Sequence, residues 1–398
     1  MLINTNKKLP SLIPFIIFFV SIAYTQPYAI GKATISFTDA SRNNRVIESD
    51  IYYPAQQAGT NVSVVAGTQK FPVISIGHGF VMSVDAYANL WNMLVPEGYI
   101  VVLPKTEGSF SPSHANFGKD LSFVIDAIQQ EGLTNNSRFF NRVDTMNCVM
   151  GHSMGGGAAH LAAAGNNKIK TIATLAAANT NPSAITAAGN LTIPSLVFAG
   201  TYDCITPPPD HQDPIYNALK SECKTYISIN GGSHCQMAES NGNCNGGEFL
   251  SGCSTPPITR ALQHSIIKSY LIPWLQFQLK KDCNAGINFE NLMKTDNKIT
   301  FNNNCSFCVL SNAQGITLPA ESRIYPNPFS ENLFLDYGKQ ATEPVDIKIQ
   351  GADGKIHLIS RFRSGLIKIN TSQLPAGSYF LHMTSRKENR IYKIVKSL

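Results

Sequence analysis

Residues 151–156 read Gly151-His152-Ser153-Met154-Gly155-Gly156, and they stand between two segments of different character. The apolar run 148–150 before them is typical of a buried strand, whereas the alanine-rich run 158–162 after them is typical of a helix. Small residues two positions before and two positions after Ser153 let a strand and a helix pack closely around a sharp turn. This is the G-x-S-x-G pattern of a nucleophile elbow, which predicts that Ser153 is the nucleophile of a serine hydrolase.

Strand patterns alternate with helix patterns from residue 33 to residue 280. The strands are apolar on both faces, which is the pattern of parallel strands covered by helices on both sides of a sheet. The segment between the expected strands 171–175 and 193–198 is too short for a multi-helix cap, so we expect an open site with no large lid. We therefore predict an α/β fold with a mostly parallel, doubly covered sheet. The expected strands are 33–53, 71–76, 99–103, 148–150, 171–175, 193–198 and 226–229, and the expected helices are 83–95, 120–130, 258–280 and the one that follows the elbow through 158–162.

A nucleophilic serine needs a base and an acid that orients the base. His234 directly follows the expected strand 226–229, and Asp203 lies five residues beyond the expected strand 193–198. Loops at the carboxyl ends of parallel strands meet at one edge of the sheet, where the elbow also lies. The order Ser153, Asp203, His234 is that of the α/β-hydrolase fold. We therefore predict a Ser153–His234–Asp203 triad that works by two-step acyl transfer.

The remaining parts of the site follow from the same placement. The backbone N–H groups of Met154, just after the nucleophile, and of Phe80, in the loop after the strand 71–76, are the expected oxyanion hole. We expect Phe80, His152 and Tyr202 to face the substrate, with packing as the alternative role for His152. The acyl-transfer chemistry needs no cofactor, and no metal-ligand pattern stands out, so neither a cofactor nor a metal is expected.

Other residues are alternative candidates for the base and the acid. His211 is close to Asp203 in the sequence, and His264 falls inside the last expected helix, so both are weaker candidates for the base than His234. Asp210 and Asp213 lie in a proline-rich loop and are alternatives to Asp203.

The N-terminus has the pattern of a secretory signal peptide. Lys7 and Lys8 precede an apolar stretch at residues 12–22, and small and polar residues follow before Gln26. The apolar stretch is too short to span a bilayer comfortably, which favours a cleaved signal at residues 1–25 over a membrane anchor. We therefore expect export.

Export predicts that most of the nine cysteines form disulfides, because an oxidising compartment favours them. Cys148 falls in the strand before Ser153 and is expected to be a buried free thiol. The other eight cysteines allow 105 pairings, so the sequence leaves the pairing open. Cys204 follows Asp203 and Cys235 follows His234, so we expect one bridge to hold the active-site loops. The pair at residues 305 and 308 has no second metal-binding pair beside it, which favours disulfides over zinc.

The length of 398 residues, with 43% apolar and 15% charged residues, fits one large globular domain plus a small one. The net charge of +6 comes wholly from residues 323–398, which hold 12 Lys and Arg against 6 Asp and Glu. No dense basic run exists, which argues against nucleic-acid binding. We also expect a monomer. Residues 282–322 lose the α/β pattern and are expected to form a disulfide-stapled tail, whereas short alternating segments from residue 323 onward predict a small C-terminal all-β sandwich. The expected divisions are a signal peptide at 1–25, an α/β-hydrolase catalytic domain at 26–310, a linker at 311–322 and the sandwich at 323–398.

Residues 33–281 resemble the secreted cutinase-like and dienelactone-hydrolase-like branch of the α/β-hydrolases, which includes bacterial polyester hydrolases. This resemblance implies carboxylic ester hydrolysis, with an aromatic residue at the Phe80 position whose backbone serves the oxyanion hole. Dienelactone hydrolases proper use a cysteine nucleophile, so Ser153 argues against their activity. Cys235 stands where polyester hydrolases often carry a phenylalanine. The matching stretches are Asp50-Ile51-Tyr52-Tyr53-Pro54, residues 151–157, Asp203-Cys204-Ile205-Thr206-Pro207 and Asn230-Gly231-Gly232-Ser233-His234.

The last 75 or so residues contain three distinctive motifs: Tyr325-Pro326-Asn327-Pro328-Phe329, residues 374–380 and the basic end Lys393-Ile394-Val395-Lys396. With these motifs the segment resembles a type IX secretion C-terminal sorting domain. The resemblance implies a Gram-negative host, passage across the outer membrane by the type IX machinery, and removal of this domain. An adhesive or carbohydrate-binding sandwich is the alternative.

Two further functions stay open beside the leading prediction of a secreted, cutinase-like or polyesterase-like serine esterase. A lipase or phospholipid acylhydrolase would use the same triad and differ in its preference for acyl-chain length. A catalytically silent surface binding protein on the same scaffold would fail to react with an organophosphonate.

Overall fold

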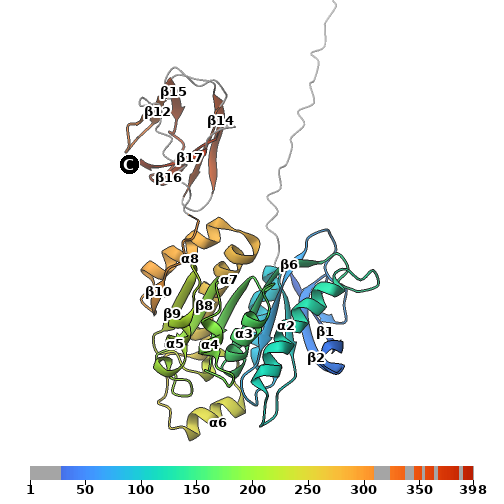
Figure 1. The fold of residues 1–398 in the computed structure, drawn as a ribbon. Coiled ribbons are helices and arrows are strands. Elements are labelled where there is room, and N and C mark those ends of the chain that lie inside the picture. The colour runs from blue at the N-terminus through green and yellow to red at the C-terminus, as the bar shows by residue number, and fades with distance from the viewer. Residues whose placement is uncertain are drawn as a thin grey trace, which may run out of the picture.

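A computed structural model describes residues 28–308, 323–336, 345–351, 355–362, 366–384 and 389–397 (Figure 1). The expected signal peptide at 1–25 and the expected linker at 311–322 lie outside these residues.

The first described range is built on a ten-stranded sheet with the order β10-β9-β8-β7-β6-β4-β5-β2-β1-β3. The strands from β5 to β9 in this order are parallel, whereas β2 pairs with β5, β1 with β2 and β10 with β9 in antiparallel fashion. The predicted mostly parallel sheet is confirmed. The strands are β1 (Ala29–Asp39), β2 (Arg45–Ala55), β3 (Gly59–Thr60), β4 (Phe71–Gly77), β5 (Ile100–Pro104), β6 (Val143–His152), β7 (Thr171–Leu175), β8 (Ser195–Gly200), β9 (Lys224–Ile229) and β10 (Ile299–Asn303).

Helices cover both faces of this sheet, and each face has its own apolar cluster (Figure 1). One cluster holds residues of α2 (His114–Glu131), α3 (Met154–Gly165), α4 (Ala184–Ala188) and α5 (Gln212–Ala218). The other holds residues of α1 (Ala88–Leu94), α7 (Arg260–Lys280) and α8 (Cys283–Thr295). The doubly covered sheet is therefore confirmed. Between β7 and β8 the structure has only the five-residue helix α4, which fits the prediction that a large lid is missing there.

Helix α2 shows how local sequence sets an element. Its apolar residues recur every three or four positions and are buried at Phe117, Leu121, Val124 and Ile128. Ser113 caps the N-terminus by accepting a hydrogen bond from the Asn116 backbone N–H, so the helix begins six residues before the expected start at 120.

The predicted disulfide-stapled tail is confirmed for the part of residues 282–322 that the structure describes, and it also contains a helix and a strand that were not predicted. Asp282 caps α8 by accepting bonds from two backbone N–H groups, and β10 adds an antiparallel edge strand to β9. Two asparagines support this pairing, because Asn303 Oδ1 accepts from Thr225 and Asn304 Oδ1 accepts from the Lys224 N–H. A segment that reads as polar and irregular thus becomes the edge of the sheet.

The eight cysteines expected to pair form four disulfides, and Cys148 is buried and free, as predicted. Cys305 and Cys308 belong to different bridges, which agrees with disulfides rather than zinc. Two bridges, not one, start at the active-site loops, because Cys204 and Cys235 have separate partners. The pairs are Cys204–Cys253, Cys223–Cys305, Cys235–Cys244 and Cys283–Cys308.

The C-terminal part is all β, as predicted. Strands β11 (Arg323–Tyr325), β12 (Asn332–Asp336) and β15 (Leu366–Asn370) form one sheet, and β13 (Val345–Gly351), β14 (Ile356–Phe362), β16 (Gly377–Thr384) and β17 (Asn389–Lys396) form another. Alternate residues of both sheets, among them Leu333, Ile347 and Leu381, share one apolar cluster. Among the residues described here, none of the helices has the length and apolar character needed to span a membrane.

Candidate active site

Ser153 lies on a strained turn between β6 and α3. Its backbone angles are φ 57° and ψ −123°, a combination that non-glycine residues rarely adopt. Three backbone hydrogen bonds hold it, since its N–H donates to Leu175 and its carbonyl accepts from Gly157 and Ala178. The strain is thus balanced by contacts with β7 and α3, and this is the backbone of a nucleophile elbow.

Two glycines make this turn possible. A Cβ atom on Gly151 would lie 2.1 Å from the Gly155 carbonyl oxygen, and one on Gly155 would lie 2.2 Å from the Gly77 carbonyl group. No side chain fits at either position, because the obstructing atoms are backbone. The motif glycines therefore bring the start of α3 against the end of β4, from which the expected oxyanion loop continues.

His234 and Asp203 meet at the carboxyl ends of β9 and β8. His234 Nδ1 lies 2.8 Å from Asp203 Oδ2, and both side chains are buried. The alternative bases are bonded elsewhere: His211 Nδ1 accepts from the Asn179 N–H, and His264 Nε2 donates to the Ala238 carbonyl.

The alternative acids are also placed away from this pair. Asp213 accepts a hydrogen bond from Tyr226 Oη at 2.6 Å, and Asp210 is exposed at the end of the short helix η4 (Pro208–Asp210). Of the acid candidates, Asp203 is the one that is bonded to His234.

Thr206, for which no role was predicted, completes the surroundings of the Asp203 carboxylate. Its hydroxyl lies 2.9 Å from Asp203 Oδ2 and 3.0 Å from His234 Nδ1. Asp203 Oδ1 accepts from the N–H groups of Ile205 and Thr206, and Gln212 Nε2 donates to the Thr206 hydroxyl. A signal existed in the spacing, because an Asp followed three residues later by Thr favours a local turn closed by both side chains.

His152, the neighbour of Ser153, lies against the expected base. The two imidazole ring centres of His152 and His234 are 4.6 Å apart, and His152 Nε2 lies 3.1 Å from the His234 carbonyl oxygen. Ser153 therefore follows directly on a residue that touches His234.

The expected oxyanion donors belong to residues that are next in the chain to Ser153 and to Gly79. Met154 is the first residue of α3, so its N–H belongs to the helix N-terminus, where backbone donors have no acceptor within the helix. Phe80 follows Gly79, and a Cβ atom on Gly79 would lie 3.3 Å from His152 Nδ1. Met154 is thus adjacent to Ser153 in the chain, and Phe80 is next to a residue that packs on His152.

Two of the three residues expected to face the substrate are exposed. Phe80 is 48% and Tyr202 is 42% accessible, whereas His152 is completely buried. The burial of His152 favours its alternative role in packing over a substrate contact. Phe110, which was not predicted, is 81% exposed and packs edge-to-face on Phe80 with ring centres 6.2 Å apart.

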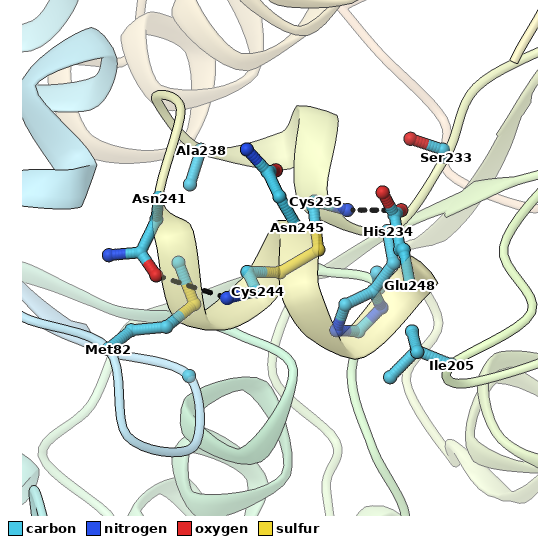
Figure 2. The surroundings of a disulfide bond; sticks show 12 residues. Met82, Ile205, Ser233, His234, Cys235, Ala238, Asn241, Cys244, Asn245 and Glu248 are labelled. Carbon is cyan, nitrogen blue, oxygen red and sulfur yellow. Dashed lines mark hydrogen bonds between the residues drawn. A yellow bond between two sulfur atoms is a disulfide. The ribbon is translucent and has the colours of Figure 1, made fainter. Parts of the chain in front are cut away.

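The helix α6 (Gly242–Leu250) is attached to the loops of the candidate site. Figure 2 shows the Cys235–Cys244 bridge beside His234, with the Glu248 carboxylate accepting a bond from the Cys235 N–H. Cys204–Cys253 anchors the other end of this segment, and Asn243 Nδ2 donates to the carbonyl of Val81. The same helix is thus tied to the loops that carry Phe80, Asp203 and His234.

Burial sets the charge state of His152. It lowers the pKa of His152 well below the usual value, and the nearby His234 lowers this pKa further. His152 is therefore neutral.

Within the described residues, no group of three or more His, Cys, Asp or Glu side chains is arranged to hold a metal ion.

Comparisons with known proteins find two matching family models and several relatives. A family model described as PET hydrolase-like matches residues 22–251, and a model of a secretion system C-terminal sorting domain matches residues 323–397. The chain is 25% identical to cutinase est1 of Thermobifida alba over 186 residues, which is 46% of this chain and 56% of that protein. It is 28% identical to the bis(hydroxyethyl) terephthalate hydrolase of Streptomyces coelicolor over 217 residues, 54% of this chain and 63% of that protein. It is 23% identical to cutinase 1 of Thermobifida cellulosilytica over 214 residues, 53% of this chain and 73% of that protein. The chain thus spans little more than half the length of the first of these relatives.

Proposed function

The chain belongs to the PET hydrolase-like family, whose model spans residues 22–251, and on that basis we propose that it is a secreted serine hydrolase that cleaves carboxylic esters. The observation that carries the proposal is the buried Asp203–His234 pair beside the elbow of Ser153. A base oriented by a carboxylate, next to a serine on such a turn, is the arrangement that activates a hydroxyl for acyl transfer.

In the proposed reaction, His234 Nε2 takes the proton of Ser153 as its oxygen attacks the ester carbonyl. The developing oxyanion is stabilised by the N–H groups of Met154 and Phe80. His234 then protonates the leaving alcohol, and the same residue later activates the water that releases the acid. Asp203 holds the imidazole in the tautomer with a proton on Nδ1 and stabilises its cationic form.

A bulky or polymeric ester is the proposed substrate. Phe80, Tyr202 and Phe110 offer exposed aromatic surface around the site, and edge-to-face packing of the kind seen between Phe80 and Phe110 suits aromatic rings in a substrate. The short connection between β7 and β8 leaves room for a long chain. One relative is named as a hydrolase of bis(hydroxyethyl) terephthalate, an aromatic diester, which supports the same class.

The matched sorting domain indicates type IX secretion to the cell surface or exterior. Together with the expected signal peptide at 1–25, it supports a division into a catalytic domain at 26–310, a linker at 311–322 and a sorting domain at 323–398. We propose that the catalytic part acts as a monomer on an ester substrate. Size-exclusion chromatography with light scattering tests this, and a stable dimer would contradict it.

The test is ester hydrolysis by the full chain produced in an oxidising compartment. Rates are measured on p-nitrophenyl acetate, butyrate, octanoate and palmitate and on bis(hydroxyethyl) terephthalate, with Ser153→Ala as the control. We expect hydrolysis that is lost in Ser153→Ala and that favours short acyl chains and the terephthalate ester.

Other outcomes point to the other two functions. A preference for palmitate favours a lipase. A folded, disulfide-bonded protein that neither hydrolyses these esters nor reacts with an organophosphonate at Ser153 would overturn the proposal in favour of a surface binding protein.

A further inference from the structure

Three buried hydrogen bonds join the expected oxyanion loop to the expected base. The Gly79 N–H donates to Tyr87 Oη at 2.7 Å, and Tyr87 Oη lies 2.9 Å from His152 Nδ1. His152 Nε2 lies 3.1 Å from the His234 carbonyl oxygen. Tyr87 and His152 are both completely buried, so water does not compete for these bonds.

The chemistry of the end groups fixes the direction of every bond. A backbone carbonyl only accepts, so His152 Nε2 carries a proton and donates to His234. Burial keeps His152 neutral, and its Nδ1 therefore has a free lone pair. Tyr87 donates its hydroxyl proton to that lone pair while its oxygen accepts from the Gly79 N–H. The three donors are thus arranged head to tail, from the loop to the base.

The alternative set of hydrogen bonds requires a positively charged His152 ring in a fully buried position. If His152 carried protons on both nitrogens, its Nδ1 would donate to Tyr87, and the tyrosine proton would turn toward Met82 Sδ at 3.4 Å. Thioether sulfur is a weak acceptor, and the imidazolium would be fully buried beside His234. The neutral arrangement is therefore the stable one.

We propose that Tyr87 and His152 are positioning residues that keep the loop of Phe80 and the backbone of His234 in a fixed position relative to Ser153. This proposal rests on the proposed function. The Gly79 N–H lies one peptide unit before the Phe80 N–H, and the Gly79 carbonyl between them lies 2.8 Å from His78 Nδ1, so these two bonds together place the peptide from which the Phe80 N–H projects. His152 immediately precedes Ser153, so the same relay passes through the nucleophile's own neighbour. No proton is transferred along it.

Tyr87→Phe tests the relay, because it removes one hydroxyl and leaves the ring in place. The Gly79 N–H and His152 Nδ1 then lose their partner inside the protein, and misplacement of the oxyanion donor and the base acts on the transition state. We expect kcat on p-nitrophenyl butyrate to fall roughly 10- to 100-fold, with KM changed less than threefold.

Tyr99→Phe is the matched control. Tyr99 is also completely buried in the same apolar cluster, and among the described residues its hydroxyl has no hydrogen-bond partner. We expect it to keep wild-type kcat and KM. A Tyr87→Phe protein that stays folded and matches Tyr99→Phe in kcat would overturn the relay.

Nitrogen-15 NMR of the histidine rings gives a readout that does not depend on how the variant folds. In the wild-type protein at neutral pH, we expect His152 to show a neutral ring with its proton on Nε2. A proton on Nδ1, or on both nitrogens, would overturn the relay. A wild-type protein without Ser153-dependent hydrolysis would overturn the proposed function itself, whereas an active wild type with a fully active Tyr87→Phe would overturn only the relay.

Discussion

The contact between Gly155 and the end of β4 leaves no room for a methyl group. A Cβ on Gly155 would lie 2.2 Å from the Gly77 carbonyl group, whereas ordinary contact begins at 3.4 Å. In Gly155→Ala, the start of α3 therefore has to move from β4 by the difference, 3.4 − 2.2 = 1.2 Å. Ser153 precedes this helix, so the nucleophile and the Met154 N–H move with it. A misplacement of this size costs on the order of 100-fold in rate, and the overpacking costs about 1–3 kcal/mol of stability.

The assay is kcat on p-nitrophenyl butyrate together with urea unfolding of the same samples. Gly165→Ala, at the far end of α3, is the control, because nothing lies within 4 Å of its Cβ position. It should keep wild-type kcat and gain about 0.4–1 kcal/mol from the less flexible unfolded chain. A Gly155→Ala protein with wild-type kcat and stability would refute the claim that this contact sets the elbow.

Three further changes test other parts of the site. Thr206→Val removes a hydrogen bond to the Asp203 carboxylate that is worth about 1.5–3 kcal/mol, so kcat/KM should fall roughly 10- to 100-fold. Thr206→Ser keeps the hydroxyl and should stay near wild type. Equal activity of the two variants would contradict this. Replacing both Cys204 and Cys253 by Ser removes a cross-link between residues 49 positions apart, which constrains the unfolded chain. The free energy of unfolding, measured in urea, should therefore fall by about 4 kcal/mol. A fall below about 1 kcal/mol would argue against this entropic stabilisation. Burial lowers the pKa of His160 from 6.5 to about 4. Between these two pH values the unfolded chain binds a proton at this residue and the folded chain does not. As the pH falls from 6.5 to 4, the unfolding free energy of the wild type relative to His160→Gln should therefore drop by about 3 kcal/mol. A pH-independent difference in unfolding free energy would contradict the burial argument for His160.

Much of the sheet could be predicted because each strand carries its own signal. Runs such as 71–76 and 99–103 are apolar without interruption, and only burial on both faces explains that pattern. The candidate site follows from the same signal. Ser153, Asp203 and His234 each come shortly after such a run, and parallel strands bring those ends together.

Features that depend on contacts distant in sequence could not be predicted. β10 is polar, with Thr300 and Asn302 exposed, and it becomes a strand because it pairs with β9. The burial of His152 depends on Tyr87 and His234 closing over it, and nothing in its own neighbourhood indicates that. The eight bridging cysteines are distributed over loops and helices whose approach is set by the whole fold, so their pairing needed the structure.

The single free cysteine is placed so that it is synthesised early and covered late. Cys148 pairs in register with Thr171, whose hydroxyl accepts a hydrogen bond from Trp274 Nε1 of α7, and α7 packs on β6 over the same apolar cluster. Five of the bridging cysteines, from Cys204 to Cys253, precede α7 in the chain. Until α7 docks, the Cys148 thiol is open to exchange with each of them. We therefore expect that removing this one sulfur lets a larger share of chains reach the native disulfide set during oxidative folding.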